Sequence, residues 1–111
     1  MAEIDFSPEF EKWFLALKDH DKEAVARAVD LLEARGVALG YPYTSAIVGS
    51  AIAMRELRVQ SGGRPVRILY AFDPKRKAFL LLGGVKSGGN RFYQRMIPIA
   101  EAIYQRHLTE E

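Results

Sequence analysis

The spacing of apolar residues changes from a helical pattern in the first third of the chain to an alternating pattern in its middle. Two stripes recur at intervals of three and four residues: Phe10, Trp13, Phe14 and Leu17, followed by Val25, Ala28, Val29 and Leu32. This spacing predicts two helices, each with one apolar face. Ser7 and Pro8 suit the start of the first helix and Gly36 the end of the second. Residues 19–21, Asp-His-Asp, are expected to separate the helices and to cap the second one.

Residues 54–93 contain three runs of strand-forming residues separated by two clusters of turn residues. The clusters are Ser-Gly-Gly-Arg-Pro at 61–65 and Asp-Pro-Lys-Arg-Lys at 73–77. Turn clusters between strand-forming runs are typical of hairpins. The segment is therefore predicted to be an antiparallel meander. Its third strand, residues 78–85, is apolar at both odd and even positions, which indicates burial on both faces.

Alternation along the strands assigns side chains to faces, because successive side chains point to opposite sides of a sheet. The alternate residues Val66, Ile68, Tyr70 and Phe72 share one face of the middle strand, which leaves Arg67 on the other. A register that pairs Val59 with Val66 also pairs Arg58 with Arg67, and we expect both arginines on an open face. In the second hairpin, pairing Phe72 with Ala78 would place Gly83 beside Arg67 and Lys86 near the same edge.

The flanking segments complete an α+β fold. Residues 4–6 are read as a short strand or a lead-in, and residues 37–53 as a long loop. A C-terminal helix, capped by Ser87 or Asn90, is expected to break at Pro98, to pack inward through residues 99, 100, 103 and 104, and to fray from His107. The predicted architecture is two N-terminal helices packed on a small, mostly antiparallel sheet, with a C-terminal helix after the last strand, in a single domain of residues 1–111.

Composition limits the class of protein. The 111 residues include no cysteine, which excludes a disulfide framework and a thiolate metal site. We find neither an apolar run of bilayer length nor a signal-peptide pattern, so no membrane contact and a cytoplasmic location are expected. Charge is uneven: residues 1–54 hold 5 basic and 9 acidic side chains, whereas residues 55–111 hold 11 basic and 5 acidic ones. The second half therefore favours an anionic partner.

The familiar catalytic motifs do not fit. Residues 83–87, Gly-Gly-Val-Lys-Ser, resemble the end of a phosphate-binding loop, but the required spacing is not met. No motif brings His20 and His107 together with carboxylates for a metal, or places a histidine for a serine triad. The remaining chemistry is that of Arg, Lys and Tyr. Two interpretations of the Arg58–Arg67 pair stay open: a solvated pair partly neutralised by Glu56, or a phosphate cradle.

Cleavage of an RNA phosphodiester is one reaction that such side chains support. The 2′-OH attacks the adjacent phosphorus, so the site must stabilise negative charge on the phosphate and transfer two protons. Arginines can stabilise the charge, and lysine or tyrosine can serve the proton transfers.

Three stretches together resemble a known family: FSPEFEKWFLAL, ELRVQSGGRPVRILYAFDPKRKAFLLLGGVKSGGNRFY and IPIAEAIYQRHL. They are similar to the RelE/ParE toxin superfamily, and most closely to its HigB-like, phage-derived branch. The resemblance implies the toxin of a type II toxin–antitoxin pair, an mRNA interferase that cuts mRNA on the ribosome without a metal or organic cofactor. It also implies a cognate helix-turn-helix, HigA-like antitoxin as partner.

The resemblance assigns roles to individual residues. Arg67 matches the arginine that contacts the scissile phosphate, and Arg58, Lys86 and Tyr93 match further catalytic positions. Additional contacts to RNA or phosphate are expected from Arg55, Arg64 and Arg91. Glu56 departs from the lysine that ribosome-dependent members often carry beside the first arginine, which leaves the general base open. Two alternatives to RNA cleavage remain, a ParE-like inhibitor of DNA gyrase and an inactive toxin that retains only its antitoxin interface.

Overall fold

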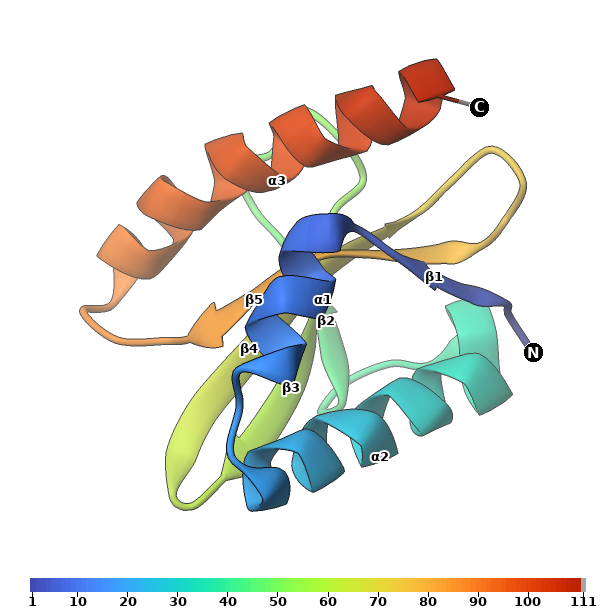
Figure 1. Cartoon of the computed structure of the whole chain (residues 1–111). Coiled ribbons are helices and arrows are strands. Elements are labelled where there is room, and N and C mark those ends of the chain that lie inside the picture. The colour runs from blue at the N-terminus through green and yellow to red at the C-terminus, as the bar shows by residue number, and fades with distance from the viewer. Residues whose placement is uncertain (111) are drawn as a thin grey trace.

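The computed structural model describes residues 1–110 and places one sheet between two helical layers (Figure 1). The strands are β1 (Ile4–Phe6), β2 (Thr44–Ala46), β3 (Arg55–Ser61), β4 (Arg64–Phe72) and β5 (Ala78–Val85). The helices are α1 (Pro8–Leu15), α2 (Asp19–Arg35), the short 3₁₀ helix η1 (Gly36–Ala38) and α3 (Asn90–Glu110). The strand order is β1-β5-β4-β3-β2, with β1 parallel to β5 and every other pair antiparallel. The predicted α+β class, with two N-terminal helices and a C-terminal helix, is confirmed.

Each face of the sheet has its own apolar core. On one face of the sheet, α1 and α2 cover Leu57, Val59, Ile68 and the other apolar side chains that point to that side. On the opposite face α3 packs against Leu69 and Ala71. The prediction that the Arg67 side of the sheet is open is therefore wrong over much of its area. Leu69 and Ala71 lie on the same face of β4 as Arg67, and the C-terminal helix packs against their apolar side chains.

The first hairpin has the predicted register, whereas the second departs from it. Val59 pairs with Val66 and Arg58 with Arg67. In the second hairpin Phe72 pairs with Ala78 as expected, but a bulge shifts the register between Leu69 and Tyr70. Arg67 consequently lies beside Gly84 and not beside Gly83. A bulge adds one unpaired residue to a strand, which simple alternation does not reveal.

The start of α1 and the end of α2 follow local chemistry. The hydroxyl of Ser7 accepts the backbone N–H of Phe10 at 2.9 Å, as an N-cap should. Gly36 ends α2 with a φ of 55°, as expected for a glycine stop. The prediction that residues 19–21 cap α2 is wrong, because its N-cap is Lys18 and no side chain bonds there. The carboxylate of Asp21 instead binds Ser61 and Arg64 and so ties α2 to the first hairpin.

The C-terminal helix differs most from expectation. It runs without a break through Pro98, which is exposed, so water can reach the carbonyl that the proline leaves without a donor. Ile99 is 46% exposed and does not pack inward, whereas Ala100 and Ile103 do. His107 is not frayed: its ring stacks on Phe79 with centroids 3.7 Å apart.

Two short strands border the meander. β1 confirms the strand alternative for residues 4–6, and its register aligns Ile4 with Ala78. β2 lies inside the predicted long loop and pairs with residues 55–57 of β3. Three residues are too few for an alternating pattern to be recognised. None of the helices within residues 1–110 combines the length and apolar character that crossing a membrane requires.

Candidate functional site

The candidate site lies on the α3-side face of the sheet, beside the first turn of α3. Glu56 and Arg58 lie two residues apart on β3 and therefore share this face, and Arg67 joins them from β4. The first turn of α3 brings Tyr93 to the same place, and Lys86 follows the end of β5. We call Glu56, Arg58, Arg67, Lys86 and Tyr93 the Glu56 cluster. The fold thus brings together all four residues predicted to be catalytic.

Glu56 is the centre of this cluster. Its Oε1 accepts a hydrogen bond of 2.6 Å from the hydroxyl of Tyr93 and lies 3.5 Å from the Nε of Arg67. Its Oε2 accepts a bond of 3.0 Å from the hydroxyl of Ser45 and lies 3.6 Å from an Nη of Arg58. Since a carboxylate lies between the two paired arginines, their repulsion is offset within the protein.

The two arginines differ in accessibility. The side chain of Arg58 is 31% exposed, whereas Arg67 is buried with 6% of its surface exposed. Arg67 donates to the carbonyl of Val66, and its buried Nε has no hydrogen-bond partner among the described residues. An anion arriving from solvent can therefore meet Arg58 first. The Nε of Arg67 remains an unused donor beside the Glu56 carboxylate.

Tyr93 is held in its neutral form. Burial, together with the hydrogen bond to Glu56, raises the pKa of Tyr93 to about 12. The Nζ of Lys86 lies 5.3 Å from the centre of the Tyr93 ring, a cation–π distance. The phenol is therefore a donor at neutral pH, with a lysine ammonium close to it.

Aromatic rings from the predicted loop extend the cluster. The guanidinium of Arg58 lies 5.5 Å from the centre of the Tyr41 ring, which is 76% exposed. Tyr43 is 51% exposed. Exposed rings beside arginine are suited to stacking on nucleobases. Sequence reasoning missed both tyrosines, because they lie in the predicted long loop and the short strand β2 that follows them has no recognisable pattern.

Arg55, Arg64 and Arg91, which were expected to add RNA contacts, lie at different places relative to the cluster. Arg55 and Arg64 have the parity of Leu57 and Val66, so they belong to the opposite face of the sheet. Arg64 donates to the carboxylate of Asp21 at 2.9 Å. Arg91 is exposed in the first turn of α3, close in sequence to Tyr93. Of these three, Arg91 is the one on the element that also supplies Tyr93 to the cluster.

The glycines that precede Lys86 have a packing role. A Cβ built at Gly83 would lie 2.4 Å from the ring of Trp13 in α1, and one at Gly84 would lie 3.1 Å from Phe92 in α3. The two helical layers therefore approach β5 closely from opposite faces. This close approach fixes the end of the strand that delivers Lys86.

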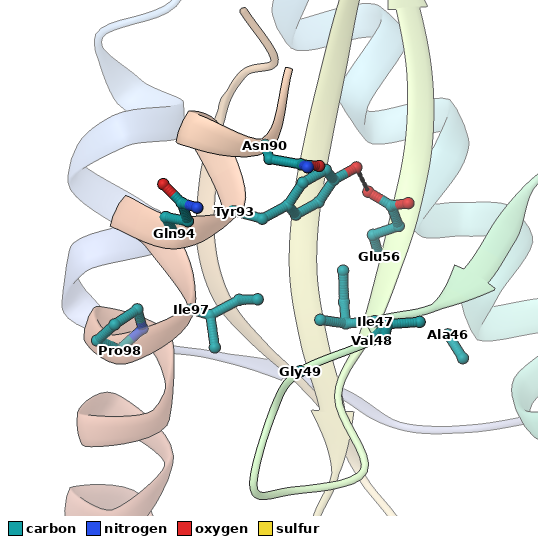
Figure 2. A pocket seen from close by; sticks show the side chains of 10 residues that line it. All are labelled: Ala46, Ile47, Val48, Gly49, Glu56, Asn90, Tyr93, Gln94, Ile97 and Pro98. Carbon is teal, nitrogen blue, oxygen red and sulfur yellow. Dashed lines mark hydrogen bonds between the residues drawn. The ribbon is translucent and has the colours of Figure 1, made fainter. Parts of the chain in front are cut away.

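A pocket of about 560 Å³ adjoins the cluster, between residues 46–49 and the first turns of α3 (Figure 2). Figure 2 shows the Glu56–Tyr93 hydrogen bond at one end of this pocket. Within residues 1–110, no three His, Asp or Glu side chains gather in a way that could hold a metal ion. The cluster offers cations, a carboxylate and a neutral phenol, which are groups that bind a phosphate and move protons.

Comparison with known proteins gives the chain its relatives. Residues 12–105 match the family described as phage-derived protein, Gp49-like. A Mycobacterium tuberculosis protein provisionally named as the toxin HigB3 is 43% identical over 106 residues, which are 94% of this chain and 91% of that protein. Another from the same organism, provisionally named as the toxin HigB2, is 40% identical over 88% of this chain and 50% of its own length. No solved structure shows a significant match.

Proposed function

The chain belongs to the Gp49-like family of phage-derived proteins, and from this premise we propose that it is the toxin of a type II toxin–antitoxin pair that cleaves mRNA on the ribosome. The relatives provisionally named as toxins support the toxin assignment. The HigB-like, phage-derived resemblance drawn from the sequence is confirmed. One observation carries the proposed chemistry: a carboxylate and a neutral phenol share a hydrogen bond within a group of three cations.

The cluster accounts for each step of cleavage by the 2′-OH. Glu56 takes the proton of the 2′-OH while the 2′-oxygen of the RNA forms a bond to phosphorus. The bond from phosphorus to the 5′-oxygen breaks, and Tyr93 donates a proton to that leaving oxygen. The products are a 2′,3′-cyclic phosphate and a 5′-hydroxyl end. Carboxylates serve as bases and phenols as acids when their protonation states match these tasks.

The three cations have different roles in stabilising the negative charge on the phosphate. Arg58 and Lys86 are the reachable ones, and we assign them direct contact with the phosphate. The resemblance gives that contact to Arg67, which is buried here. We propose that Arg67 orients the Glu56 carboxylate and that its buried positive charge stabilises the negative charge that builds on the phosphate. A fixed charge of this kind stabilises a transition state without reorganisation.

The proposed partners follow from the same assignment. They are the mRNA on the ribosome and a cognate helix-turn-helix, HigA-like antitoxin, with the protein acting in the cytoplasm. The basic second half of the chain favours anionic partners through electrostatic steering.

The test maps new 5′ ends on a reporter mRNA in a translating bacterial extract. We expect codon-phased cuts that require both ribosomes and Arg67, and that disappear with Arg67→Ala. Circular dichroism must show that the variant is folded. A folded wild-type protein that leaves the mRNA intact would contradict the nuclease assignment. Plasmid supercoiling by purified gyrase would then separate a gyrase inhibitor from an inactive toxin, because an inhibitor alters supercoiling directly.

A further inference from the structure

We infer that the pocket beside the Glu56 cluster binds a nucleobase of the RNA, namely the base whose 3′-phosphate meets the cations. This inference rests on the proposed function and extends it to the residues that read the base. The pocket has two walls, residues 46–49 at the end of β2 and just beyond it, and residues 90–98 of α3 (Figure 2). We call it the base pocket.

The size and lining of the base pocket suit a flat, partly apolar group. Its volume of about 560 Å³ lies within the range of small-molecule sites. Apolar side chains line both walls, with Ile47 and Val48 on one side and Ile97 and Pro98 on the other. A nucleobase can bury its faces against such walls while its edges remain free for hydrogen bonds.

Polar groups at one end can read those edges. Asn90 and Gln94 lie one turn apart on α3, and both line the pocket. A carboxamide presents a donor and an acceptor side by side, the pattern that pairs with base edges. Figure 2 shows Asn90 and Tyr93 on the first turn of α3, at the end of the pocket where Glu56 lies.

The wall after β2 is held in place by the C-terminal helix. The Oε2 of Glu101 accepts hydrogen bonds from the hydroxyl of Ser50 at 2.8 Å and from the backbone N–H of Ala51 at 2.7 Å. The N–H of Ile47 donates to the carbonyl of Met54 at 2.9 Å. The pocket is therefore formed before any ligand arrives, which reduces the entropic cost of binding.

Its position links base recognition to the reacting phosphate. Glu56 both lines the pocket and lies within 3.6 Å of Arg58. One carboxylate thus separates the base pocket from the cations. A nucleotide can place its base against Ile97 and Val48 while its 3′-phosphate reaches Arg58.

The test is a titration of methyl-labelled, side-chain-amide-labelled protein with the four nucleoside 3′-monophosphates, followed by NMR. Inorganic phosphate serves as the probe that has no base. We expect saturable shifts of the methyls of Ile47, Val48 and Ile97 whose size depends on the base, and little change there with phosphate. Shifts that are the same for phosphate and for all four nucleotides would overturn the inference.

A matched pair of variants tests the pocket itself. Val48 is 93% exposed at the pocket and Val37 is 81% exposed on η1, so glutamate at either position leaves the core intact. We expect Val48→Glu to weaken nucleotide binding at least tenfold, and Val37→Glu to leave it unchanged. Equal effects of the two variants would contradict a pocket-specific site. Gln94→Ala is expected to change the ranking of the four bases.

The outcomes separate the pocket from the nuclease assignment. Base-dependent binding by a protein that leaves mRNA uncut would contradict cleavage but support the base pocket. Codon-phased cuts whose base preference is the same in wild type, Val48→Glu and Gln94→Ala would support cleavage but overturn the base pocket.

Discussion

At the scale of single residues, the Glu56 carboxylate sets the electrostatic environment of Arg58 and Arg67. Arg58 and Arg67 are paired across β3 and β4, and the Glu56 carboxylate lies within 3.6 Å of both. The resting site therefore already contains an anion. In the proposed reaction, the phosphate enters beside Arg58 and the 2′-OH gives its proton to this carboxylate, which is our proposal for the general base that the sequence left open.

Exchange of Glu56 for glutamine tests that role, because the amide keeps the shape of the side chain but cannot accept a proton. We predict that Glu56→Gln lowers the rate of RNA cleavage by about 100-fold or more, the usual size of a general-base effect. The rate is measured under single-turnover conditions with ribosome-bound mRNA. Ser45→Ala, which removes a neighbouring hydrogen bond to the same carboxylate, serves as the milder control. Undiminished cleavage by folded Glu56→Gln would exclude Glu56 as the base.

The phenol of Tyr93 gives a prediction at high pH. Its folded pKa of about 12 lies above the ordinary value of 10.0. The stability from the neutral phenol is therefore present below pH 10 and is lost between about pH 10 and 12, since the unfolded chain releases the proton first. We expect the unfolding free energy of wild type to fall more steeply in that range than that of Tyr93→Phe. Denaturant titrations at each pH measure this, and parallel curves would argue against a buried, neutral phenol.

At the scale of elements, local patterns predicted the parts of the fold that local chemistry controls. The first hairpin register, the Ser7 cap and the Gly36 stop follow from turn residues, parity and capping. The bulge in β4–β5, the course of α3 through Pro98 and strand β2 depend on contacts between distant segments. The Arg58–Arg67 pair was predictable because it follows from the register of the first hairpin. Neutralisation of that pair by Glu56 was part of one of the two interpretations of the sequence, and the structure shows the contacts. The hydrogen bond from Tyr93 to Glu56 was not predictable, because it depends on where α3 places Tyr93.

Gly83 tests how closely α1 approaches β5. A methyl group at Gly83 would meet the ring of Trp13 at 2.4 Å, whereas one at Gly40 would meet no atom within 4 Å. We predict that Gly83→Ala lowers the free energy of unfolding by roughly 1–3 kcal/mol, as overpacking does. Gly40→Ala should leave it unchanged or slightly higher. Urea unfolding measures both, and equal values for the two variants would refute the close contact.

Asp73 tests the docking of the far end of α3. Burial acts to raise its pKa, but hydrogen bonds from His107 and from the backbone of Lys77 and Lys75 outweigh it and hold the pKa of Asp73 below its ordinary value. That stability is present above about pH 4 and is lost as the pH falls below it. We expect Asp73→Asn to be less stable than wild type at pH 7, with the difference shrinking below pH 4. The exposed Asp30→Asn is the control, and a pH-independent difference for Asp73→Asn would contradict the assignment.

At the scale of the whole molecule, the two helical layers differ, because only the α3 layer borders the candidate site. α1 and α2 cover one face of the sheet, and α3 covers part of the other and leaves the Glu56 cluster and the base pocket at its first turns (Figure 1). The basic second half of the chain supplies α3 and all five residues of the Glu56 cluster. Under the proposed function, phosphate and base are bound side by side on this surface.

The most direct test of this account is the chemistry of the cut ends. Ribosome-bound mRNA is treated with wild-type protein or Glu56→Gln, and the new termini are identified by their reactivity toward phosphatase, kinase and ligase. We predict 2′,3′-cyclic phosphate and 5′-hydroxyl ends with wild type, and a strongly reduced yield with Glu56→Gln. Termini with a 5′-phosphate, or no cleavage by folded wild-type protein, would contradict attack by the 2′-OH at the Glu56 cluster.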